Sequence, residues 1–203
     1  MAYTAEEEQE LNEIKTWWKE NYKTLIASVI IAFGGVFGWN YWQNHQLNKI
    51  QQTSAQYEQA LYSTADFASK SVKIEQFVQA NSKTSYAVLA LLEKAKVEVE
   101  KKEFAQAEQS LKQALAQSTD ENLSSITALR LASVQYQQQA FDMALDSLKQ
   151  VKESSWDSRK NLLIGDILLA KGDKVAAKAS YQQALNNASP LEAQWLQVRL
   201  NNL

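Results

Sequence analysis

The chain carries two kinds of hydrophobic pattern, one continuous and one periodic. From Leu25 to Trp42, eighteen residues run without a charge, and only Ser28 and Asn40 among them are clearly polar. As a helix this stretch would measure roughly 27 Å, close to the roughly 30 Å hydrocarbon core of a bilayer. The pattern therefore predicts a transmembrane helix over residues 24–42.

Aromatic residues mark both ends of this apolar run. Four of the six Trp of the chain lie there, at the two levels where aromatic belts form. With two tyrosines, the aromatic residues are Trp17, Trp18 and Tyr22 before the run and Trp39, Tyr41 and Trp42 at its end. A buried core helix is the alternative, but a helix that is apolar on all sides between two aromatic girdles favours a membrane span.

Residues 1–23, before the run, form an acidic tail. Its early glutamates differ from the short basic start of a secretory signal peptide, so the run is expected to stay attached. The stretch Met1–Glu13 is charged and lacks an apolar face, and it is therefore expected to be mostly disordered.

Positive charges beside the run indicate its orientation. Lys15, Lys19 and Lys23 precede it, whereas Lys49 alone follows it closely. The positive-inside rule then places the N-terminus in the cytoplasm and residues from 43 onward in the periplasm of a bacterium. Within the run, Gly34 and Gly38 share one helix face, so they are predicted to let another transmembrane helix pack closely.

Residues 43–85 show helical spacing of apolar positions. An amphipathic, Gln-rich helix is predicted from Gln46 to Phe67, as a stalk that continues from the span. A shorter helix around Ile74, Phe77 and Val78 follows, and the polar stretch 81–85 is expected to end it.

Residues 86–203 contain a repeated pattern. Ala107, Ala144 and Ala177 each begin a similar apolar motif, 37 and 33 residues apart, which is close to the 34-residue tetratricopeptide period. Twelve residues before each of them lies a small residue, so two antiparallel helices can pack closely in every copy. The small residues are Ala95, Ala132 and Gly165, and the large residues expected to fill the space between helix pairs are Leu111, Leu148 and Tyr181.

The chain closes with a well-signalled helix. Ser189, Pro190 and Glu192 form a capping-box start, and an apolar stripe follows. The stripe is predicted to cap the third helix pair, with Trp195 in the core in preference to the alternative of a ligand site. Its members are Leu191, Trp195, Val198 and Leu200.

Composition agrees with an all-α fold, a single N-terminal transmembrane helix followed by an α-solenoid of tetratricopeptide-like pairs with a capping helix. Five Gly and one Pro leave little material for the tight turns of β-sheets. The absence of Cys excludes disulfides and thiolate sites, and His45 is the only His. The net charge of −2 speaks against nucleic acid as a partner.

The residue pattern predicts no catalytic, cofactor-binding or metal site, and hence no enzyme. A partner-binding groove is expected instead along the first helices of successive pairs. Counting from the small residues places five side chains in that groove, namely Lys96, Tyr136, Gln137, Arg159 and Asp166.

Several strings carry a resemblance across essentially the whole chain. They are Gly38-Trp39-Asn40-Tyr41-Trp42 with His45-Gln46, Asp120-Glu121-Asn122-Leu123, Leu129-Arg130-Leu131-Ala132, Lys171-Gly172-Asp173 and Asn201-Asn202-Leu203. With the acidic tail and single span, they resemble the ancillary SecYEG translocon subunit family (YfgM-like). Asn40 stands where a basic residue would be expected in relatives.

The resemblance implies an inner-membrane protein of a Gram-negative bacterium that works beside the SecYEG translocon. It implies the membrane-anchored periplasmic chaperone PpiD and emerging secretory proteins as further partners, with a link to the stress-response regulator RcsB. The alternative is a structural envelope scaffold that self-associates through its span and stalk. Crosslinking would separate these two hypotheses.

Overall fold

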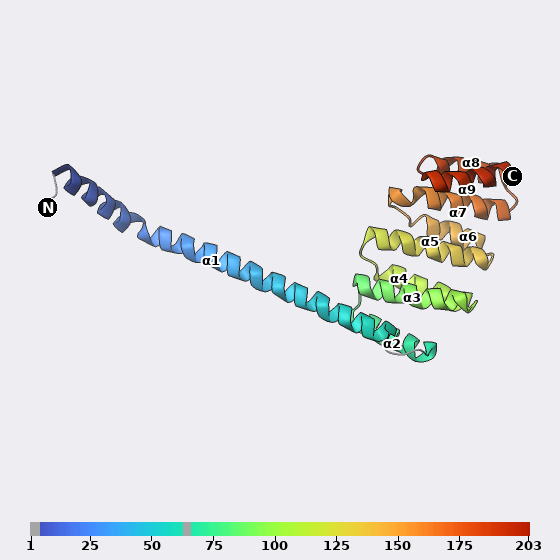
Figure 1. Ribbon diagram of the computed structural model, residues 1–203, viewed down its shortest axis with the longest axis horizontal. Coiled ribbons are helices and arrows are strands. Elements are labelled where there is room, and N and C mark those ends of the chain that lie inside the picture. Colours follow the sequence, from blue (N-terminus) through green and yellow to red (C-terminus); the bar gives the residue numbers. More distant parts are fainter. Residues whose placement is uncertain (1–4, 63–65) are drawn as a thin grey trace. The chain divides into compact units, whose positions relative to one another are not determined.

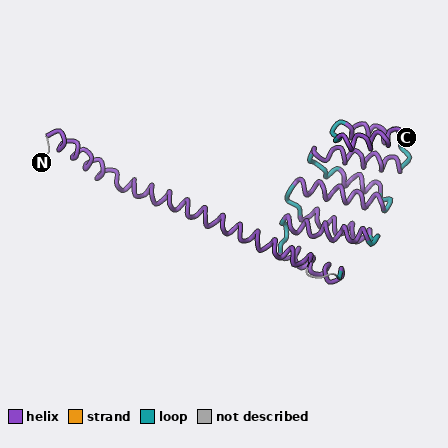
Figure 2. The backbone as a smooth tube through the Cα atoms, viewed as in Figure 1, coloured by secondary structure: helices purple, strands orange, loops and turns teal. Residues whose placement is uncertain are grey.

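The computed structural model describes residues 5–62 and 66–203, and within these ranges the fold is helical with no strand (Figures 1 and 2). The chain divides into two compact units, between Gln52 and Thr53. The helices are α1 (Ala5–Tyr62), α2 (Phe67–Ala80), α3 (Ser85–Glu100), α4 (Phe104–Gln117), α5 (Glu121–Gln137), α6 (Phe141–Leu148), the 3₁₀ turn η1 (Ser154–Trp156), α7 (Asp157–Ala170), α8 (Lys174–Leu185) and α9 (Pro190–Asn201). This confirms the all-α expectation, whereas the ranges 1–23, 24–42, 43–85 and 86–203 stay predictions.

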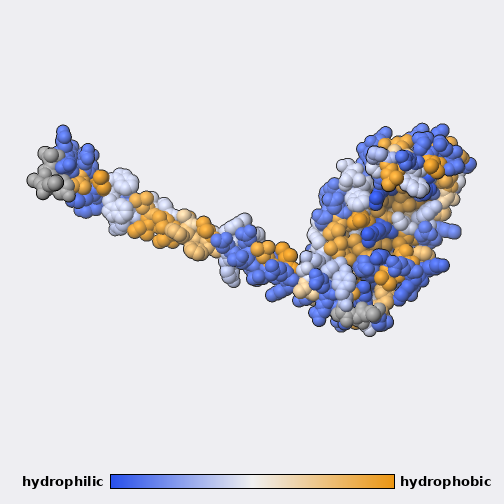
Figure 3. Space-filling view, viewed as in Figure 1, coloured by the Kyte–Doolittle hydropathy of each residue, from blue (hydrophilic) through white to orange (hydrophobic). Residues whose placement is uncertain are grey.

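The first unit consists of the part of α1 before Thr53. Figure 3 shows its band of hydrophobic side chains, and α1 is long and apolar enough to cross a membrane. None of the most apolar window of α1 is buried within the protein, which argues against a soluble core helix.

The acidic tail is helical from Ala5, so the expectation of disorder up to Glu13 is wrong for the described part; residues 1–4 lie outside the described residues. Glu6, Glu7 and Glu8 occupy the first turn of α1. Negative charges there interact favourably with the positive end of the helix dipole. The expectation of disorder considered the charge of the tail but not the position of these acids in a first helical turn.

The boundary between α1 and α2 differs from the sequence prediction. The described part of α1 ends at Tyr62, and Phe67 is the first residue of α2 rather than the last of the stalk. Asp66 causes this start, because its carboxylate accepts a 2.8 Å hydrogen bond from the Ser69 amide. The short helix ends at Asn81, as expected.

Helices α3 to α8 form three antiparallel pairs, α3/α4, α5/α6 and α7/α8, stacked in chain order in Figure 1. The predicted small residues Ala95, Ala132 and Gly165 are all buried at the interior of these pairs. The predicted large residues Leu111, Leu148 and Tyr181 are almost completely buried as well. The spacing of these positions therefore identified the helix pairs correctly.

The same kind of turn joins the two helices of each pair. The seventh residue after each small residue has a positive φ, at Lys102 (64°), Gln139 (60°) and Gly172 (88°). In the first pair the Glu103 amide donates to the Glu98 carbonyl at 2.8 Å and the Lys102 amide to the Val99 carbonyl at 2.9 Å. This is the Schellman arrangement, which satisfies the last carbonyls of the helix.

A buried polar position also recurs in the pairs. Ser110, Ser147 and Ser180 lie three residues after the leading alanines. Ser110 hydrogen-bonds to Glu98 of the preceding helix. The Ser147 hydroxyl donates a 2.7 Å hydrogen bond to Gln135, whereas Ser180 bonds to the Ala176 carbonyl within its own helix. We call the pairs Ser110–Glu98 and Ser147–Gln135 the first and the second serine rung.

Helix α9 begins as predicted but packs through Leu196 and Leu200, of which only Leu200 belongs to the predicted stripe. Both bonds of the Ser189–Glu192 capping box are present. Trp195 is 65% exposed, as is Leu191, and Val198 is 53% exposed, while Leu196 is fully buried against Tyr181 and Ala184. The prediction that Trp195 lies in the core is therefore wrong.

Candidate functional site

The first helices of the three pairs and α9 line two adjoining cavities, which together we call the groove. The first cavity, of about 310 Å³, lies between α3 and α5, and the second, of about 520 Å³, involves α5, α7 and α9. Arg130 and Ser133 of α5 line both cavities, so they mark the place where the two meet.

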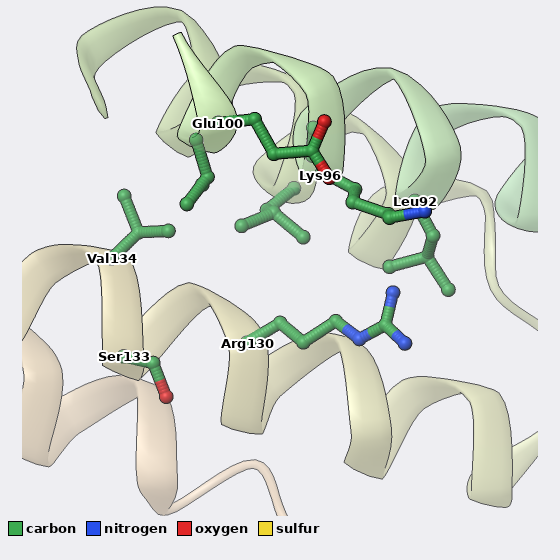
Figure 4. Close-up of a pocket in the computed structure, with 9 residues that line it drawn as sticks. Leu92, Lys96, Glu100, Arg130, Ser133 and Val134 are labelled. Atoms are coloured by element: carbon green, nitrogen blue, oxygen red, sulfur yellow. The ribbon is translucent and has the colours of Figure 1, made fainter. Parts of the chain in front are cut away.

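The first cavity has an apolar floor and charged side chains around it (Figure 4). The side chains of Lys96 and Arg130 reach the end of the cavity beside Leu92. Lys96 lies 3.7 Å from the Glu93 carboxylate, and the Lys96 side chain is more exposed than that of Glu93. The apolar lining residues are Leu92, Ala95, Val99, Leu111 and Val134.

The second cavity is larger and has aromatic walls. Trp156 and Trp195 both line it, and the Arg159 guanidinium lies 5.8 Å from the ring centre of Trp156. Such cation–π contacts add modest stabilisation at exposed sites. The apolar lining is completed by Ile126, Leu129, Leu162, Leu163 and Leu196.

The acids of the second cavity already have partners. Arg159 Nε lies 3.3 Å from Glu192 Oε1, and the hydrogen bonds from Ser189 hold the pKa of Glu192 below its usual value. Asp166 accepts a 2.7 Å hydrogen bond from the Tyr181 hydroxyl and pairs with Arg199 at 2.6 Å. Burial raises the pKa of Asp166, while both partners oppose that rise. These acids stabilise the wall of the groove.

Three of the five predicted groove residues line the cavities. Lys96 belongs to the first cavity, and Arg159 and Asp166 belong to the second. Tyr136 and Gln137 line neither; the Tyr136 ring lies 5.9 Å from the ring of Phe141. The structure therefore brings Arg159 and Asp166 together in one cavity and joins Lys96 to them through the shared wall of Arg130 and Ser133.

Four groove residues were not predicted from the sequence, namely Ser133, Arg130, Trp156 and Trp195. A signal for Ser133 was available, because it follows Ala132 just as Lys96 follows Ala95 and Asp166 follows Gly165. The leucines three residues before the small residues, Leu92, Leu129 and Leu162, also line the groove. Consistent counting through the repeats predicts these positions, whereas Tyr136 and Gln137 came from a different register.

The predicted packing site in the span lies in the first unit. A Cβ atom added at Gly34 or Gly38 would meet no atom within 4 Å, so both positions are open to a partner helix. Among residues 5–62 and 66–203 no group of three or more His, Cys, Asp or Glu side chains could hold a metal ion.

Comparison with known proteins gives full-length matches. A family model described as a tetratricopeptide repeat-like domain matches residues 15–203. Proteins named "Ancillary SecYEG translocon subunit" are similar over the full chain: 63% identical in Aggregatibacter actinomycetemcomitans and 56% in Haemophilus influenzae, each covering 100% of both sequences. The protein of that name from Escherichia coli is 33% identical, over 97% of this chain and 96% of its own.

Proposed function

The chain belongs to the ancillary SecYEG translocon subunit family, and from this premise we propose that it binds the translocon and other proteins through two surfaces. The span would contact membrane partners, and the groove would hold a segment of a protein on the far side. The observation that carries this proposal is the full-length identity of 63% and 56% to two proteins of that name.

We propose that the N-terminus is cytoplasmic and that the helix pairs lie in the periplasm, with the span in the bacterial inner membrane. The support is the excess of Lys before the span over Lys after it. In this orientation the groove faces the compartment into which secretory proteins emerge.

The role that follows is to pass emerging secretory proteins to periplasmic chaperones. The proposed partners are SecYEG, the membrane-anchored chaperone PpiD and the emerging chains themselves, with RcsB as a cytoplasmic partner of the tail. A groove with apolar cavities suits this role, because unfolded chains expose the apolar segments that such cavities take up.

Site-specific photo-crosslinking in intact cells tests the two surfaces separately. Probes replace Gly34 in the span and Ser133 in the groove, and the captured proteins are identified. Val36, on the opposite face of the span, and Lys178, an exposed residue of α8, carry the control probes. A further probe at Tyr136 tests whether that predicted residue also meets a partner.

Capture of SecY or SecE from Gly34, and of a chaperone or a secretory protein from Ser133 but not from Lys178, would support the proposal. Capture of only this protein itself, or of unrelated envelope components, would contradict it. That outcome would favour an envelope scaffold that self-associates through its span and stalk.

A further inference from the structure

Arg130 occupies the centre of the groove and differs from the other basic residues there. It is exposed, lines both cavities, and makes no ion pair with any residue in the described ranges. Lys96 has Glu93 at 3.7 Å, and Arg159 has Glu192 at 3.3 Å. The groove therefore presents one uncompensated positive charge at its midpoint.

Apolar surface lies on both sides of this charge. On one side are Leu92, Val99 and Val134, and on the other Leu129 and Leu162. A ligand that crosses α5 would place a side chain in each cavity and pass over Arg130 between them. Burial of apolar side chains in the two cavities would contribute the main favourable free energy of binding.

We propose that the groove binds an extended peptide segment of a partner protein in which one acidic side chain lies between two apolar ones. Arginine suits this role because its planar guanidinium can bind a carboxylate through two parallel hydrogen bonds. This inference rests on the proposed function of the groove as a protein-binding surface and specifies the chemistry of the segment that it takes.

The geometry of the helix stack sets the spacing of the segment. One packed helix is about 8–10 Å wide, and an extended chain crosses that distance in about three residues. The apolar side chains consequently lie within about two positions of the acid, on the same face of the segment, because alternate side chains of an extended chain point the same way.

The acids around the groove limit the ligand to one central negative charge. Glu100 lines the first cavity, and Asp166 and Glu192 line the second, so they flank Arg130 on both sides. Glu192 and Asp166 already pair with Arg159 and Arg199, and Lys96 has Glu93, so acids in the outer positions of a segment would find these cations already compensated. The groove thus favours the order apolar, acidic, apolar over a run of acids.

Fluorescence anisotropy with the full chain in lipid nanodiscs tests this inference. The probes are three labelled nine-residue peptides with Leu two positions before and two after a central Glu, Gln or Lys, and with Ser and Gly elsewhere. We expect the Glu peptide to bind about fivefold more tightly than the Gln peptide, and the Lys peptide to bind most weakly. This preference should shrink in high salt.

Variants of the protein assign the preference to Arg130. Arg130→Gln should bind the Glu and Gln peptides equally, and Arg130→Glu should reverse the order in favour of the Lys peptide. Lys178→Gln, on α8 and outside both cavities, is the matched charge-removing control and should retain the preference of the parent chain. Thermal unfolding verifies that each variant is folded, which we expect because the Arg130 side chain is exposed.

Equal affinity of the parent chain for the Glu and Gln peptides would overturn the inference, as would an unchanged preference in Arg130→Gln. Failure to bind any peptide, with translocon capture from Gly34 intact, would overturn the inference and leave the translocon association standing. A clear Glu preference without translocon capture would instead contradict the proposed function.

Discussion

The Tyr181 hydroxyl donates a 2.7 Å hydrogen bond to Asp166 Oδ1, the oxygen that also pairs with Arg199 at 2.6 Å. One carboxylate thereby joins α7, α8 and α9. Burial and the bond to Asp166 raise the pKa of Tyr181, which keeps its hydroxyl protonated as the donor. The negative charge of Asp166 consequently maintains the last helix pair and is not free for a ligand.

The ring of Tyr181 makes Gly165 a sensitive position. A Cβ at Gly165 would lie 2.5 Å from Tyr181 Cδ1, and this ring is fully buried and cannot move aside easily. We expect Gly165→Ala to lower the free energy of unfolding by about 1–3 kcal/mol, measured by urea denaturation of the full chain in detergent.

The other two pairs show which second substitution should offset a larger residue at position 165. Ala95 and Ala132, which correspond to Gly165, occur there with Leu111 and Leu148 in place of Tyr181. Adding Tyr181→Leu to Gly165→Ala should therefore cost less than the sum of the two single changes. Additive losses, or a Gly165→Ala variant as stable as the parent, would show that the ring does not set the size of residue 165.

The first serine rung contains a buried carboxylate. Glu98 is 4% exposed, and its Oε2 has no hydrogen-bond partner in the described chain. Burial raises the pKa of Glu98, Glu103 and Glu75 add to the rise, and Ser110 and Lys94 oppose it. Between the ordinary and the raised pKa the folded state binds more protons than the unfolded state, so stability falls as pH rises through that window.

Glu98→Gln copies the second rung, where Gln135 bonds to Ser147, and removes this titration. We expect the variant to be more stable than the parent at pH 7 by about 1 kcal/mol, with the difference shrinking as pH falls below the window. Urea unfolding across that pH range measures it. A parent chain that is more stable than the variant at pH 7 would mean that the charge of Glu98 is stabilising.

The turn between α5 and α6 contains a non-glycine residue at positive φ. Gln139 has φ of 60°, where a side chain is sterically disfavoured and glycine is not. Gln139→Gly should raise the free energy of unfolding by about 0.5–1 kcal/mol. Gln137→Gly, at the last residue of α5, is the control and should lower stability, by less than glycine costs in a helix interior. Calorimetry of both variants checks the opposite signs.

The span offers a test in the membrane. Gly34→Leu and Gly38→Leu together should reduce translocon capture from a probe elsewhere in the span, because bulky side chains keep a partner helix away. Val36→Leu changes the opposite face and should leave capture unchanged. Equal capture from both variants would exclude the glycine face as the contact.

The repeats and the span could be predicted from the sequence because each depends on a residue type at a fixed interval. Gly165 and Tyr181 are an example, since the spacing that they share with Ala95 and Leu111 and with Ala132 and Leu148 predicted that a small residue lies near a large one in each pair. The turns at Lys102 and Gln139 could not be found in this way, because neither residue type signals a left-handed backbone.

Trp195 was mispredicted as the buried residue of α9 because the sequence pattern of this helix is ambiguous. Apolar residues occur around most of this helix, so periodicity does not decide between Trp195 and Leu196 as the buried side chain. In the groove, the sequence shows the charge of Arg130 but not whether an acid lies near it. The lack of an ion-pair partner within the described residues depends on how the helices pack.

The serine rungs share the residue type on the second helix, so a second helix docked on the first helix of another pair would still offer a serine there. The fit between Gly165 and Tyr181 would not survive such an exchange. On α3 or α5 the Tyr181 ring would meet the Cβ of Ala95 or Ala132, just as it would meet a Cβ at Gly165. The third pair thus carries a label of size, which favours its own partner helix during folding.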